Sequence, residues 1–160
     1  MGKARVLLFD IDGTLVNQQL NTIFPIRKLH CRQFEKTSAK QITEEKTAKY
    51  FLNTIQKNIT DFTLSFFGSG DFHHLTAMIL QQLHEPFFIL MFDRHYDIGS
   101  KRLKNHSNLE YHCGAWLYSA LQLPLCEGCL LVGPQSNKLT RWLQGVSYLE
   151  KNYNLHVIEG

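Results

Sequence analysis

The segment that decides the fold is Phe87–Asp97, with the sequence FFILMFDRHYD. Its first six residues, Phe87–Phe92, are all apolar, which is typical of a strand that is buried on both faces. Asp93, His95 and Asp97 follow at alternate positions, and alternate side chains of an extended backbone point the same way. Mixed carboxylate and imidazole ligands suit Mn²⁺, Fe²⁺ or Zn²⁺. We therefore expect a buried strand that delivers three metal ligands at its carboxyl end.

Other segments of the chain alternate between strand-like and helix-like patterns. Short apolar runs predict four more strands, at Arg5–Asp10, Phe62–Phe67, Cys129–Val132 and Leu155–Ile158. Apolar stripes with caps predict helices at Thr43–Lys57, Asp71–Leu83, Gly114–Leu121 and Leu139–Leu149. Residues 17–42 fit neither pattern. The alternation predicts an α/β fold, a three-layer αβα arrangement with a mostly parallel sheet, in a single domain over residues 1–160. Active sites of such sheets lie at the carboxyl ends of the strands.

Two more segments offer histidines near those strand ends. Gly68–His74 (GSGDFHH) combines glycines, which allow a sharp turn, with His73 and His74, either of which can point at the same site. The alternative is that Asp71 only caps a helix and that both histidines lie on its surface. His112, before Cys113-Gly114, can serve as a proton shuttle because an imidazole titrates near neutral pH. Otherwise it is a loop histidine.

Composition narrows the classes of function. The net charge is +3, and the basic residues are scattered, which argues against nucleic acid as a partner. No apolar run reaches the roughly 18 residues of a membrane span or resembles a signal peptide. A cytoplasmic protein with free thiols and a small-molecule substrate is therefore expected. The pair Cys126-x-x-Cys129 is either half of a zinc site or, with no second pair, the flank of a core strand.

In their order along the chain, the histidine turn, the Asp-x-His-x-Asp segment and the His112 loop resemble motifs of the arginase/agmatinase (ureohydrolase) family. That family has a Gly-Gly-Asp-His turn, then Asp-Ala-His-x-Asp after the next strand, then a His-Gly loop. The resemblance is closer to uncharacterised arginase-like proteins, which carry Gly-Ser-Gly-Asn-Tyr-His, Phe-Asp-x-His-x-Asp and Cys-Gly-x-Trp. The equivalents here are Gly68–His73, Pro86–Asp97 and Cys113–Trp116. The resemblance covers about residues 62–134.

This resemblance implies a site for two manganese ions with Asp93 bridging them. His73 and Asp97 would complete one ion, and His95 would serve the other. A shared water would become a hydroxide that attacks a guanidino or amide carbon, and His112 would pass the proton to the leaving amine. The family's later Ser-x-Asp-x-Asp strand has no counterpart after residue 134. We therefore expect one of three situations: the chain is truncated before that strand, the site is completed by a partner or by Asp10-Ile11-Asp12, or the site is degenerate. In a truncated domain the sheet would have an unpaired edge strand, which would favour homo-oligomers.

A competing interpretation rests on Phe9–Val16 (FDIDGTLV), which resembles the first motif of haloacid-dehalogenase-like phosphatases. That resemblance implies Asp10 as the phosphoryl-accepting nucleophile, Asp12 as general acid/base, and Mg²⁺ as cofactor. A Ser or Thr ending a second strand and a Lys ahead of an acidic pair, both expected in that family, are not recognisable. A third hypothesis is a degenerate, non-catalytic metal-binding domain.

Overall fold

The computed structural model describes residues 6–15, 18, 26–30, 43, 45–56, 64–66, 69–99, 112–135 and 145–160. The chain divides into two compact units, Met1–His73 and His74–Gly160. Each unit contains a three-stranded parallel sheet, so the α/β class with parallel strands is confirmed. Within the described residues, no helix is long and apolar enough to span a membrane.

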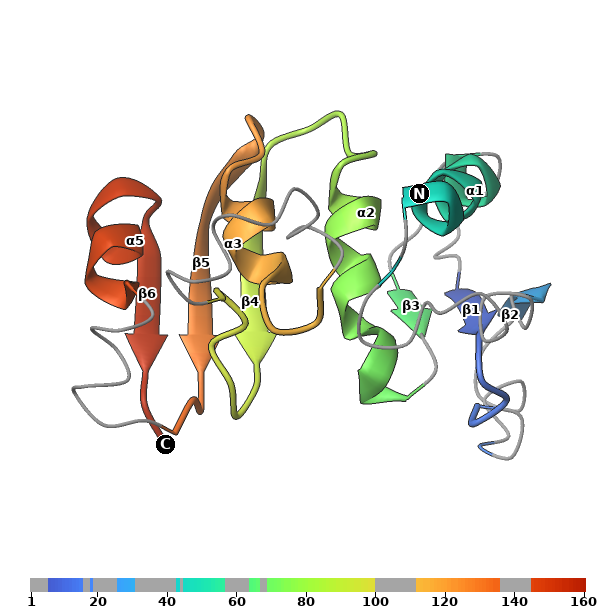
Figure 1. Ribbon diagram of the computed structural model, residues 1–160, viewed down its shortest axis with the longest axis horizontal. Helices are drawn as coiled ribbons and strands as arrows, with labels where there is room; N and C mark the ends of the chain where they lie inside the picture. Colours follow the sequence, from blue (N-terminus) through green and yellow to red (C-terminus); the bar gives the residue numbers. More distant parts are fainter. Residues whose placement is uncertain are drawn as a thin grey trace, which may run out of the picture. The chain divides into compact units, whose positions relative to one another are not determined.

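The sheet of the first unit has the order β2-β1-β3 (Figure 1). The central strand β1, Val6–Asp10, pairs in parallel with β2, Ile26–His30, and with β3, Leu64–Phe66. Helix α1, Glu45–Gln56, lies close to its predicted bounds. Its apolar stripe is fully buried, at Ala48, Phe51 and Ile55. β1 and β3 match predicted strands, whereas β2 lies in the stretch that the sequence left unassigned.

A continuous helical run joins β3 to the next strand. It begins as the 3₁₀ helix η4, Gly70–Leu75, and continues as the α-helix α2, Thr76–Leu80. Phe72 and Met78 of this run are at most 2% exposed. The division between the two units falls inside this run. His73 is therefore carried by the same helical segment as the first residues of the second unit.

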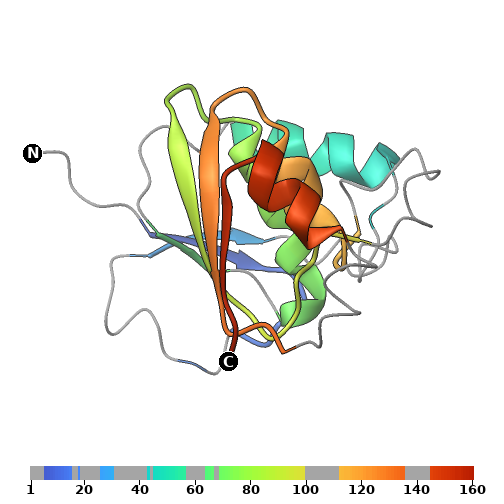
Figure 2. The same ribbon diagram turned by 90° about the vertical axis from the view of Figure 1, so that its left-hand side faces the viewer.

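The second unit contains β4, Phe87–Phe92, β5, Cys126–Val132, and β6, Leu155–Ile158, in the order β4-β5-β6. Helix α3, Trp116–Leu121, connects β4 to β5, and α5, Val146–Asn152, connects β5 to β6. Both helices lie on one face of the sheet (Figure 2). This is expected because crossovers between parallel strands are right-handed, and two successive steps in one direction place their helices on the same side.

The two faces of β4 differ in burial. Ile89 and Met91 belong to the core beneath the helices, together with Leu117, Leu121, Cys129, Leu131, Leu149 and Leu155. Phe88, Leu90 and Phe92 point the other way and are 48%, 59% and 74% exposed. Helices thus cover one face of this sheet, and the expectation that β4 is buried on both faces is wrong: within the described residues no element covers Phe88, Leu90 and Phe92. The three-layer arrangement and the single domain over 1–160 stay predictions.

Strand β5 is longer than its apolar run predicts. It begins at Cys126 instead of Cys129, and its register against β4 shifts between Phe87 and Phe88, as in a β-bulge. Gly128 has φ 145° at this irregularity. A side chain there would meet the carbonyl oxygen of Asn154 at 2.6 Å, so the bulge requires glycine. Of the helix predicted over Leu139–Leu149, residues 139–144 lie outside the described part of the chain, and α5 begins at Val146.

Candidate metal centre

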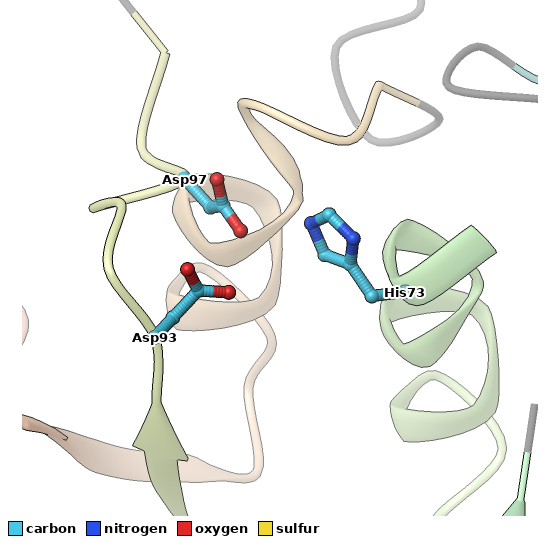
Figure 3. Close-up of side chains that lie close together, drawn as sticks. All are labelled: His73, Asp93 and Asp97. Carbon is cyan, nitrogen blue, oxygen red and sulfur yellow. The ribbon is translucent and has the colours of Figure 1, made fainter. Parts of the chain in front are cut away.

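Three metal-ligating side chains converge at the carboxyl end of β4. His73, Asp93 and Asp97 each offer one ligand atom, and these three atoms lie within 4.8 Å of one another. Figure 3 shows both carboxylates, which come from the loop after β4, facing the imidazole ring, which comes from η4. These are three of the four predicted ligands. The alternative placement of His74 is not used, since His74 is fully buried.

The backbone of Asp93 is held by a hydrogen bond that continues the pairing of β4 with β5. Its backbone N–H donates to Val132 on β5 with an N–O distance of 3.1 Å, which extends the strand pairing by one residue. Its Oδ1 accepts the backbone N–H of His95 at 2.9 Å, so the carboxylate closes the turn that follows the strand. The side chain is 27% exposed. It therefore sits at the rim of the site, fixed by its own loop.

Asp97 is held by helix α3. It is 7% exposed and adopts φ 48°, a left-handed conformation that Asp tolerates better than most residues. Its Oδ2 accepts the indole N–H of Trp116 at 3.1 Å. Trp116 is 4% exposed, so its ring belongs to the core, and the helical spacing of the apolar residues says nothing about this polar contact. The only sequence signal for it is the Cys-Gly-x-Trp resemblance.

The orientation of His73 is set by its own helical turn. Its Nδ1 is hydrogen-bonded to the carbonyl oxygen of Gly70. A carbonyl oxygen only accepts, so Nδ1 carries the proton and the ring lone pair lies on Nε2. In Figure 3 one ring nitrogen is turned toward the carboxylates and the other toward the helix. Metal-binding histidines commonly donate their second ring N–H to a backbone carbonyl in this way, which fixes the tautomer.

His95 and His112 lie outside this group of three. The His95 side chain is 76% exposed, and its Nδ1 is 3.5 Å from Asp93 Oδ1. Alternation fails here because β4 ends at Phe92, and the five residues that follow form a loop instead of an extended strand. His112 is half-buried, and its Nδ1 accepts the backbone N–H of Gly114 at 2.9 Å, which leaves the proton of a neutral ring on Nε2.

The donor set fits a divalent transition metal. One imidazole nitrogen and two carboxylate oxygens are the ligand types that Mn²⁺, Fe²⁺ and Zn²⁺ share. With metal–ligand distances of about 2.0–2.2 Å, adjacent ligand atoms of an octahedron lie about 3 Å apart and opposite ones about 4.2 Å apart. The three ligand atoms lie within 4.8 Å of one another, a limit slightly wider than these separations. A small inward movement of the side chains would bring all three onto one ion.

The phosphatase-like segment has a different environment. Asp12 Oδ1 accepts the Thr14 hydroxyl at 2.7 Å and the Thr14 backbone N–H at 3.2 Å, and Oδ2 accepts the Ser69 backbone N–H at 2.9 Å. Partial burial acts to raise the pKa of Asp12, but these hydrogen bonds from Thr14 and Ser69 lower it to about 2. Asp12 is therefore ionised at neutral pH. Asp10 ends β1, and its side chain lies outside the described structure.

The Cys126-x-x-Cys129 pair has no features of a metal site. Cys129 is fully buried, and desolvation, with a contribution from Cys126, raises its pKa to about 12. Burial also raises the pKa of Cys126, whose thiol lies 3.6 Å from the carbonyl oxygen of Gly128. Zinc binds the thiolate form, which is disfavoured at both positions. Their place on β5 agrees with the core-strand interpretation.

Comparison with known proteins gives one partial relative. A segment of 75 residues is 31% identical to an uncharacterized protein of Thermotoga maritima. That segment is 47% of this chain and 28% of the relative, so the match spans well under half the length of that protein. No family model and no solved structure matches the chain.

Proposed function

We propose that this chain carries the metal-binding part of a ureohydrolase-type hydrolase site, with His73, Asp93 and Asp97 as ligands of Mn²⁺. The observation that carries the proposal is the convergence of three ligand atoms within 4.8 Å, from two segments that sequence analysis selected separately. The tautomer of His73 agrees with it, because a ring that carries its proton on Nδ1 has its lone pair on Nε2, the atom that would coordinate the ion. The burial of Asp97, whose Oδ2 accepts the Trp116 N–H, agrees with it, because buried carboxylates in proteins are hydrogen-bonded, paired or bound to a metal.

A second Mn²⁺ would share Asp93 with the first. His95 Nδ1 lies 3.5 Å from Asp93 Oδ1, close to the separation of two adjacent ligand atoms on one ion. Because the His95 ring is largely exposed, it is accessible to an ion arriving from solvent. In this arrangement Asp93 would be shared by both ions, His73 and Asp97 would hold one of them, and His95 would hold the other. Exposed and incomplete, the second position should bind the ion more weakly than the first.

The reaction we propose is hydrolysis of a C–N bond in a small guanidino or amide substrate in the cytoplasm. Bound Mn²⁺ would supply Lewis-acid chemistry and lower the pKa of water toward neutrality. His112 would carry a proton to the leaving amine from Nε2, since its Nδ1 is engaged by Gly114. Catalysis calls for further carboxylates of the kind that the Ser-x-Asp-x-Asp strand supplies in the resembled family. Without them the same ligands would make a metal-binding domain that does not turn over substrate.

The decisive experiment is Mn²⁺ binding to the purified chain, followed by calorimetry and by loss of the free Mn²⁺ EPR signal. We expect binding in the wild type, loss of it in Asp93→Ala, and wild-type affinity in the control Glu85→Gln. Glu85 is an exposed carboxylate that lies outside the three-residue group. Equal affinity in Asp93→Ala and wild type would contradict the proposal.

A Mg²⁺-dependent phosphatase that uses Asp10 is the alternative. The state of Asp12 weighs against it, because a carboxylate with a pKa of about 2 and three hydrogen-bond donors is a poor general acid at neutral pH. Under the alternative, hydrolysis of a generic phosphate ester should require Mg²⁺ and disappear in Asp10→Asn. Under our proposal, Asp10→Asn should bind Mn²⁺ as the wild type does.

A further inference from the structure

Asp97 is the most deeply placed of the three ligands, and helix α3 holds it at two points. Its carbonyl oxygen accepts the backbone N–H of Leu117 at 3.0 Å, and its Oδ2 accepts the indole N–H of Trp116 at 3.1 Å. Gly99 N–H also donates to the carbonyl oxygen of Gly114, at 2.7 Å. These hydrogen bonds dock the ligand-bearing loop on the first residues of α3 and on Gly114, which precedes the helix.

The bond from Trp116 differs from the other two because it acts on the coordinating group itself. Trp116 is 4% exposed and Asp97 7% exposed, so water does not compete strongly for this contact. The indole is rigid and donates a single hydrogen bond, which fixes the plane of the carboxylate. A carboxylate has about four lone-pair sites, so a group that accepts the Trp116 N–H can also bind a metal ion.

We propose that Trp116 is a positioning residue for the metal centre, which holds the Asp97 carboxylate at the angle needed for coordination. This inference rests on the proposed function, because it assumes that Asp97 binds the ion. Partners that orient metal ligands typically change metal affinity by about 10–100-fold when they are removed. Trp116 also connects the centre to the helix that follows His112, the proposed proton shuttle.

The test replaces Trp116 by Phe, which keeps an aromatic ring in the core and removes the N–H. We expect the affinity for Mn²⁺ to fall about 10–100-fold relative to wild type. The matched control is Leu121→Ala, which removes a core side chain of the same helix that is 3% exposed and leaves the bond to Asp97 in place. This control should lower the melting temperature and leave Mn²⁺ affinity close to that of the wild type.

A spectroscopic readout tests whether the ion binds at Asp97, next to Trp116. Trp116 and Trp142 are the two tryptophans of the chain. In a Trp142→Phe background, Mn²⁺ should quench the emission of Trp116, because a paramagnetic ion on Asp97 is one hydrogen bond away. Asp97→Asn in the same background should abolish the saturable quenching.

The outcomes distinguish the two proposals. If the wild type binds no Mn²⁺, the proposed function fails and this inference fails with it. If the wild type binds Mn²⁺ and Trp116→Phe binds it equally well, the positioning role is wrong and the metal site stands. Equal weakening by Trp116→Phe and Leu121→Ala would also overturn the inference, because it would show a general effect of destabilising α3.

Discussion

The phenol of Tyr96 donates a hydrogen bond to the carboxylate of Glu159, with 2.7 Å between the Tyr96 hydroxyl oxygen and Glu159 Oε1. These residues are 63 positions apart, and the bond ties the metal-ligand loop to the end of β6. Tyr96 lies between the ligands Asp93 and Asp97 and is 3% exposed. The loop is therefore fixed from β6 as well as from α3.

Removing this bond should lower the free energy of unfolding while the packing of the Tyr96 ring stays the same. In Tyr96→Phe the ring stays in place, and we expect the free energy of unfolding to fall by about 1 kcal/mol, the usual net value of one hydrogen bond. Urea denaturation measures it. Glu159→Gln keeps an acceptor oxygen and should stay closer to wild type. Unchanged stability in Tyr96→Phe would show that the bond contributes nothing in solution.

Gly128 should be intolerant of a side chain. In Gly128→Ala the new Cβ would meet the Asn154 carbonyl oxygen at 2.6 Å and its side-chain nitrogen at 2.7 Å, at a backbone φ of 145°. We expect a loss of at least about 2 kcal/mol in the free energy of unfolding. Gly70→Ala is the control, because nothing lies within 4 Å of its Cβ position, and it should change stability by less than about 0.5 kcal/mol. Similar melting temperatures for the two variants would contradict this reading of the bulge.

Asp12 should make the first unit sensitive to acid. Its folded pKa, about 2, lies below its ordinary value of 3.8, so its contribution to stability is present above about pH 4. That contribution is lost as the pH falls toward 2. Urea midpoints of wild type and Asp12→Asn should therefore differ most near neutral pH and converge in this window. Thr14→Ala, which removes one donor to Asp12, should show part of the same effect; a difference independent of pH would contradict it.

Cys129 should be unreactive while the chain is folded. Burial raises its pKa to about 12, and thiol reagents attack the thiolate. Titration with a thiol-specific chromogenic reagent should count the same number of reactive thiols in native wild type and native Cys129→Ala. In urea, the variant should show one fewer. A fall in bound metal in Cys129→Ala would instead favour the zinc interpretation of this pair.

The exposed side of β4 should promote self-association. Phe88, Leu90 and Phe92 form an apolar strip, and such strips are common at interfaces between proteins. Phe92→Ser should reduce the population of oligomers in sedimentation velocity, with little change in melting temperature because Phe92 is 74% exposed. Tyr148→Ser removes an exposed aromatic residue from α5 instead and should leave association unchanged. A wild-type chain that sediments as a single monomeric species would contradict the prediction.

The strands and helices could be predicted where the pattern of apolar residues in the sequence matches the pattern of burial. β4 has its predicted bounds, Phe87–Phe92, because an unbroken apolar run permits little else. β2 was not predicted, since Ile26–His30 reads IRKLH and becomes a strand through its pairing with β1. β5 begins at Cys126 because a bulge with Gly128 at positive φ interrupts the apolar pattern. Pairing partners and bulges are tertiary facts that local patterns do not contain.

In the candidate site, too, local sequence patterns predicted some features and missed those that depend on tertiary structure. Asp93 and Asp97 could be selected because they follow a buried strand, and His73 because of the glycine-rich turn before it. The alternation rule also placed His95 with them, but the loop after Phe92 is not extended, and the ring of His95 turns to solvent. The contact of Trp116 with Asp97 joins residues 19 positions apart. A donor that lies on an apolar helix face is indistinguishable from a core residue in the sequence.

The sequential strand order β4-β5-β6 has a consequence for how the centre is assembled. Each strand of the second unit pairs with the next one along the chain, so all the strand pairings of this sheet are made within that unit. Domains generally fold as units. Asp93, Asp97 and Trp116 all belong to this run. We therefore expect the carboxylate half of the centre to reach its geometry through contacts made within His74–Gly160, without awaiting the distant pairings of β1 with β2 and β3.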